Sequence, residues 1–109
     1  MSSPKGYTCA TMKDFIGHEW TTEDEAEINQ IRINTFADCT GDHQWIHVYP
    51  EVAKKHSPFG TTVAHGFLVL SMLAGSIADI GIIPEDAKGV LNYGTNKVRF
   101  LTPVVVNSK

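Results

Sequence analysis

The sequence predicts a single α+β domain in which a long apolar helix is covered by a sheet. The helix is expected over residues 64–80, where apolar side chains lie on nearly every face and therefore need cover from more than one side. Two extended segments, Val90–Gly94 and Lys97–Leu101, follow it, and a third strand is expected at Val104–Val106. Because two or three strands seldom stand alone, either a partner chain supplies further strands or this polypeptide is a fragment.

The length and composition restrict the class of protein. A chain of 109 residues favours one domain, with a flexible leader predicted at residues 1–13 and the folded domain at residues 14–109. The net charge of −3 gives no electrostatic basis for a nucleic-acid partner. The longest apolar stretch, Phe67–Ala74, is too short to span a membrane. Two cysteines without a signal peptide favour reduced thiols in a cytoplasmic protein.

The first half of the chain is predicted to be helical up to a glycine-broken turn. Thr22-Glu23-Asp24-Glu25 fits a capping box, so a helix is expected over residues 23–38 with Ile28, Ile31 and Thr35 on one face. A shorter helical turn is expected at Pro50–Lys55.

The turn Thr40–His47 between these helices carries most of the chemistry. Asp42 and His47 are five positions apart, near enough to direct a carboxylate and an imidazole at one water molecule. Those two groups are the minimum for general acid–base catalysis at neutral pH. The alternative is structural, with Asp42 as a turn residue after Gly41 and His47 as a partly buried polar group.

A second candidate is the pair His65-Gly66 at the predicted start of the long helix. Glycine lets a ligand approach the backbone, and an N–H at the positive end of a helix can polarise a carbonyl oxygen. In the alternative interpretation Gly66 only permits tight packing, and His65 caps the helix or faces water.

Other side chains give weaker signals. A metal site is disfavoured because the candidate ligands lie on different segments without HExxH or CxxC spacing; these are Asp42, His43, His47, His56 and His65. Trp45 fits a pocket wall or, by default, a plug in the core.

Taken in order, these residues resemble the MaoC-like dehydratase family of (R)-specific enoyl-CoA hydratases, and within it the NodN-like branch. The family motif of an aromatic residue, Gly-Asp, a polar pair, an aliphatic residue and His matches Phe36 to His47. Later segments match in the same order, so that the resemblance covers about residues 14–106: Ser57-Pro58-Phe59-Gly60, Ala64-His65-Gly66-Phe67, Asn92-Tyr93-Gly94 and Lys97-Val98-Arg99-Phe100.

The resemblance implies a hot-dog fold, a central helix wrapped by an antiparallel sheet, with assembly into a homodimer or higher oligomer. It implies a cofactor-free hydratase or dehydratase that interconverts trans-2-enoyl and (R)-3-hydroxyacyl thioesters of CoA or acyl-carrier protein. Asp42 and His47 would hold the catalytic water, and the Gly66 N–H would bind the thioester oxygen. The expected substrate-binding residues are Gly66, His65, Trp45 and Phe59.

Two alternatives stay open. Family members continue for several strands beyond Pro103-Val104, so the domain here is expected to lack its last strands. One alternative is therefore a non-catalytic or truncated hot-dog module that acts as an oligomer partner. A hot-dog thioesterase is the other alternative, but such enzymes carry a carboxylate on the central helix, where this chain has only Asp79 at the far end.

Overall fold

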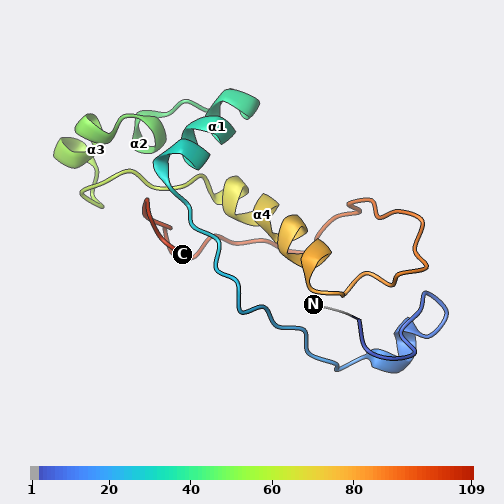
Figure 1. Cartoon of the computed structure of the whole chain (residues 1–109). Helices are drawn as coiled ribbons and strands as arrows, with labels where there is room; N and C mark the ends of the chain where they lie inside the picture. Colours follow the sequence, from blue (N-terminus) through green and yellow to red (C-terminus); the bar gives the residue numbers. More distant parts are fainter. Residues whose placement is uncertain (1–2) are drawn as a thin grey trace. The chain divides into compact units, whose positions relative to one another are not determined.

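The structure is a computed structural model that describes residues 3–109 (Figure 1). Its helices, in chain order, are η1 (Met12–Phe15), α1 (Gln30–Thr40), α2 (Trp45–Val48), α3 (Pro50–His56) and α4 (Gly66–Asp79). The chain forms two compact units, Met1–Asp24 with Met72–Val98, and Glu25–Ser71 with Arg99–Lys109. In the described part of the chain no helix has the length and apolar character needed to cross a membrane.

The first unit contains an aromatic cluster built around η1. Tyr7 is buried against the edge of the Phe15 ring and beside Trp20, and its hydroxyl donates to the Ile82 carbonyl at 2.6 Å. Part of the segment predicted as a leader, up to residue 13, therefore takes part in packing within this unit.

In the second unit, α1 begins later than the sequence predicts. The prediction that Thr22–Glu25 form a capping box is wrong. The N-cap is Asn29, whose side chain accepts a hydrogen bond from the Arg32 amide at 2.9 Å. The reason is tertiary: the Ile28 amide donates to Ser108 and the Ile28 carbonyl accepts from Asn107, so Ile28 cannot be helical. The helix predicted over residues 23–38 is therefore replaced by an eleven-residue helix, Gln30–Thr40.

The buried face of α1 also differs from the prediction. Ile33 and Ala37, four residues apart on the helix, are fully buried, whereas Ile31 is largely exposed. The later helical turn is confirmed, because α3 covers Pro50–His56 with proline at its first position. In Figure 1, α2 lies between α1 and α3, and it packs against both.

Backbone hydrogen bonds join three distant segments of the second unit. The Ala64 amide donates to Val104 at 2.8 Å, and the Val106 amide donates to Thr62 at 3.0 Å. These bonds form an isolated antiparallel bridge between Val63 and Val105, while a second bridge joins Ile28 to Ser108. The C-terminal segment therefore holds residues 62–64 in place, directly before the start of α4.

The predicted strands are wrong for this structure. No strand forms at Val90–Gly94 or Lys97–Leu101, and Val104–Val106 contributes only the bridge at Val105. A strand needs a partner strand along its length, and the described residues supply none for these segments.

The long helix is confirmed within two residues at each end, since α4 covers Gly66–Asp79. The expected all-round cover is wrong in this structure: among its residues only Leu68 is buried, and Phe67 and Leu73 are largely exposed. The cause is the same as for the strands, because the sheet that would wrap the helix is not formed.

Candidate active site

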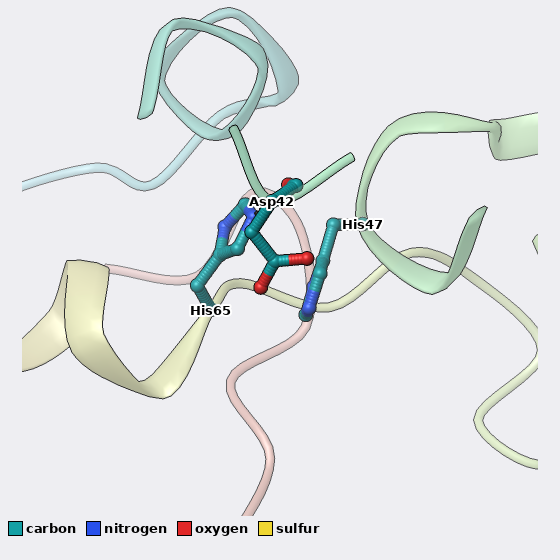
Figure 2. Close-up of side chains that lie close together, drawn as sticks. All are labelled: Asp42, His47 and His65. Atoms are coloured by element: carbon teal, nitrogen blue, oxygen red, sulfur yellow. Dashed lines mark hydrogen bonds between the residues drawn. The ribbon is translucent and has the colours of Figure 1, made fainter. Parts of the chain in front are cut away.

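The candidate site lies in the second unit, where the turn after α1, helix α2 and the start of α4 meet (Figure 2). Gly41 ends α1 in the left-handed conformation, at a φ of 87°, and its amide donates to the Ala37 carbonyl at 2.8 Å. Glycine adopts that conformation without steric cost, so the chain can turn sharply and present Asp42.

Three side chains of the predicted site come together there. Asp42, His47 and His65 each offer one oxygen or nitrogen atom, and these atoms all lie within 4.8 Å of one another. Figure 2 shows them converging from three separate segments. The two histidines are buried, at 7% and 3% exposure, whereas Asp42 is partly open to solvent.

The hydrogen bonds of His47 define its neutral tautomer. Its Nδ1 lies 2.7 Å from the Val63 carbonyl oxygen. A carbonyl can only accept, so Nδ1 carries the hydrogen and Nε2 keeps a lone pair. That lone pair is the base that proton abstraction from water requires.

The tautomer of His65 is the opposite one. Its Nε2 lies 2.9 Å from the backbone oxygen of Asp42 and therefore donates, while its Nδ1 is buried without a hydrogen-bond partner. The two imidazoles are stacked, with ring centroids 3.8 Å apart and an angle of 24° between the planes.

This stacking disfavours a metal at the three residues. A metal bonds to imidazole nitrogen in the plane of the ring, at about 2.0–2.1 Å. A point shared by two nearly parallel stacked rings lies well outside both planes, which so short a bond does not tolerate. His43 and His56 are not part of the cluster; His43 instead pairs with Asp38 at 2.9 Å, and that hydrogen bond raises the pKa of His43.

Two further polar residues, Gln30 and Thr62, hold the backbone of His47 in place. The Gln30 side chain donates to the His47 carbonyl at 2.7 Å and accepts from the hydroxyl of the buried Thr62 at 2.6 Å. No sequence motif marked Gln30 or Thr62, because the bonds join residues 17 and 32 positions apart.

Three of the predicted substrate-binding residues, Gly66, Trp45 and Phe59, lie outside the cluster of Asp42, His47 and His65. A Cβ added at Gly66 would lie 2.7 Å from the Phe100 ring, so close packing against Phe100 requires glycine there. Trp45 begins α2 and is 38% exposed, and Phe59 lies in the turn after α3 and is 45% exposed. The structure thus brings Asp42, His47 and His65 together but does not add the two aromatic residues to that cluster.

Two grooves flank the start of α4. One, of about 500 Å³, is lined by α1 residues and Leu68, and its wall includes Phe36, whose ring contacts His65 at a centroid distance of 4.9 Å. The other, of about 440 Å³, runs along Gly66 and residues 99–104.

Comparison with known proteins assigns the family. The family model described as "MaoC like domain" matches residues 11–109. The chain belongs to the MaoC-like domain family. It is 46% identical over 95 residues to Nodulation protein N of Rhizobium leguminosarum bv. viciae, covering 86% of this chain and 58% of that protein. It is 48% identical over 91 residues to 3-hydroxyacyl-thioester dehydratase Z of Mycobacterium tuberculosis, covering 84% and 56%.

Two solved structures have a similar fold. The monoamine oxidase regulatory protein of Archaeoglobus fulgius superposes with a TM-score of 0.64 at 35% identity, over 75% of this chain and 54% of that one. The R-hydratase PhaJ1 of Pseudomonas aeruginosa gives 0.61 at 24% identity, over 75% and 49%. These neighbours have the hot-dog fold, which supports that fold class for this chain, although the described residues form only isolated bridges and no sheet. The MaoC-like chain spans little more than half the length of the curated relatives it matches.

Proposed function

We propose that this MaoC-like chain belongs to a hydratase or dehydratase that interconverts trans-2-enoyl and (R)-3-hydroxyacyl thioesters. The observation that carries the proposal is that a ring nitrogen of the buried His47 and a carboxylate oxygen of Asp42 lie within 4.8 Å of each other, while the Val63 carbonyl fixes the hydrogen of His47 on Nδ1. The name of the mycobacterial relative, a 3-hydroxyacyl-thioester dehydratase, supports the same reaction.

The proposed reaction needs a base, an acid and one water. In hydration, Asp42 orients a water molecule and His47 Nε2 takes a proton from it while the oxygen bonds to C3 of the enoyl thioester. Electrons of the C2–C3 double bond move toward the thioester oxygen. The proton on His47 then passes to C2, which restores the carbonyl and leaves the 3-hydroxyacyl product. Dehydration is the reverse sequence.

The negative charge that develops on the thioester oxygen needs a hydrogen-bond donor. The Gly66 amide is the proposed donor, because the first amides of a helix have no acceptor within the helix and lie at its positive end. Phe100 packs against Gly66 and lines the same groove, so the thioester would enter beside that ring. Trp45 and Phe59 stay predictions as walls for the acyl group.

The proposal extends to the sheet that a hot-dog domain requires. Residues 90–101 carry exposed apolar side chains, and we assign them to the antiparallel sheet of a hot-dog domain that assembles as a homodimer in the cytoplasm. The substrate would be an acyl thioester of CoA or acyl-carrier protein, with neither nucleic acid nor membrane as a partner.

A hydration assay with two variants tests the proposed function. Loss of enoyl absorbance is followed with crotonyl-CoA and with a long-chain trans-2-enoyl-CoA. Asp42→Asn and His47→Ala should each lower kcat by roughly 10²–10⁴-fold, as expected when an acid–base group is removed. His56→Ala, at the exposed end of α3, is the matched histidine control and should hydrate as the unaltered chain does. The proposal fails if Asp42→Asn and His47→Ala are as active as that control. Release of free CoA thiol in place of hydration would point to the thioesterase alternative.

A further inference from the structure

We propose that His65 is a positioning residue of the hydration reaction, which holds Asp42 and His47 in register and does not itself bind the acyl thioester. This inference rests on the proposed function of Asp42 and His47. It gives a role to a buried histidine that the acid–base steps leave unused.

The first contact is with the backbone of Asp42. The Nε2–H of His65 donates to the Asp42 carbonyl at 2.9 Å and joins residues 23 positions apart. The other hydrogen bonds of Asp42 are long and local: its amide lies 3.4 Å from the Thr40 hydroxyl, and its carboxylate lies 3.4 Å from the Gln44 amide. The bond from His65 is therefore the short connection between this turn and the start of α4.

The second contact is with the ring of His47. The stacked His65 ring covers one face of His47 at 3.8 Å, and Phe36 contacts His65 in turn. With its Nδ1 bonded to the Val63 carbonyl, His47 is held both along its edge and across its face. One side chain, His65, thus fixes the positions of both groups that would share the catalytic water.

The ring of His65 has no free donor for the thioester oxygen. Its Nε2–H is already engaged by Asp42, and its Nδ1 is buried without a partner. An unpaired buried acceptor destabilises the fold, and phenylalanine would stack on His47 without that cost. What the imidazole adds at this position is the Nε2–H donor, which phenylalanine lacks.

Two amide variants separate the two nitrogens of the ring. In His65→Gln the amide reaches about as far as Nε2 and can still donate to the Asp42 carbonyl. In His65→Asn the amide stands near the position of Nδ1 and falls short of that carbonyl. Because a displacement of about 1 Å can cost roughly a hundredfold in rate, His65→Asn should lose about a hundredfold in kcat for crotonyl-CoA with KM little changed. His65→Gln should recover kcat to within about tenfold of the unaltered chain.

A second readout needs no substrate. The ¹³C shift of the Asp42 carbonyl should change in His65→Asn and stay close to its original value in His65→Gln. The ¹⁵N spectrum of His47 should show the Nδ1–H tautomer in the unaltered chain and in His65→Gln. If the unaltered chain hydrates no enoyl thioester, the proposed function fails, while the carbonyl shift still decides whether His65 positions Asp42.

Three results would overturn the inference. These are equal kcat and equal carbonyl shifts in the two amide variants, a loss confined to KM, or greater activity in His65→Asn than in His65→Gln. If His65→Asn does not fold, His65→Phe replaces it, because it keeps a stacked ring and removes the Nε2–H donor together with the unpaired Nδ1. Full activity in that variant would also overturn the inference.

Discussion

Residues 62–66 and residues 90–101 respond differently to the absence of a sheet. Thr62, Val63, Ala64 and His65 are all buried, and their backbone is bonded to the C-terminal segment, to α2 and to α4. In residues 90–101, Leu91 is 93% exposed and Tyr93 is fully exposed, and no strand forms. A few backbone bonds to distant segments suffice to build the site, whereas the extended segment needs a partner strand along its whole length.

The difference shows which part of the fold the described residues can stabilise by themselves. The site depends on short contacts between α1, α2 and the start of α4, all within one compact unit. The extended residues would gain stability only from pairing and burial against other strands. Substitutions in residues 62–66 and in residues 90–101 should therefore differ by about 1 kcal/mol or more in their effect on the unfolding free energy.

The largest effect on stability is expected at Gly66. Gly66→Ala places a methyl group 2.7 Å from the Phe100 ring and should cost about 1–3 kcal/mol of unfolding free energy through overpacking. Gly75→Ala is the control on the same helix, because an added Cβ there meets no atom within 4 Å; it should be neutral or stabilising by up to about 1 kcal/mol. Urea denaturation measures both, and equal effects would show that contact with Phe100 does not select glycine.

An effect of the same order is expected at Gln30. Gln30→Ala removes the donor to the His47 carbonyl and leaves the buried Thr62 hydroxyl without its acceptor, so it should cost about 1–3 kcal/mol. Asn34→Ala removes only the exposed side-chain bond between Asn34 and Gln30 and should cost no more than about 0.5 kcal/mol. A similar loss in both, measured by urea denaturation, would mean that Gln30 stabilises α1 and not the site.

A smaller, pH-dependent effect is expected at His43. Its hydrogen bond to Asp38 raises its pKa, so the folded protein binds this proton more tightly than the unfolded chain does. The pair should stabilise fully below about pH 6.5, and the contribution should disappear as the pH rises through the raised pKa. Tm measured from about pH 5.5 to pH 8 should show a smaller acid-side stabilisation in both His43→Asn and Asp38→Asn than in the unaltered chain. An unchanged profile in either variant would contradict this assignment.

The smallest effect is expected in the extended segment. At protein concentrations where the chain is a monomer, Leu91→Ser should change the unfolding free energy by less than about 0.5 kcal/mol, because the side chain has almost no contacts to lose within its own chain. The measurement should be repeated over a range of protein concentrations. A larger loss that grows with concentration would show that Leu91 is covered by a second chain, as the proposed dimer requires.

The parts of the fold that sequence reasoning located are those with local causes. Gly41 ends α1, Pro50 begins α3, and the apolar run after His65 forms α4 within two residues of the expected bounds. The start of α1 was missed because Ile28 pairs with Asn107 and Ser108, about eighty residues away. No local pattern around the capping box could have shown that pairing.

The candidate site divides in the same way. The motif supplied Asp42, His47 and His65 by the order and spacing of their residue types, and the order of the motifs along the chain indicated the family, which the family model confirms. Gln30 and Thr62 carry no motif, so their support of His47 could be seen only once the chain was folded.

By itself, the sequence determined the chemical groups and the local turns that present them, because residue type and backbone preference act over a few positions. The tertiary structure decided which ring nitrogen of His47 and of His65 carries the hydrogen, and that these two rings stack on each other. It also decided that Phe100 packs against Gly66. Those features depend on carbonyl oxygens and rings from distant segments, whose positions are set only when the whole unit packs.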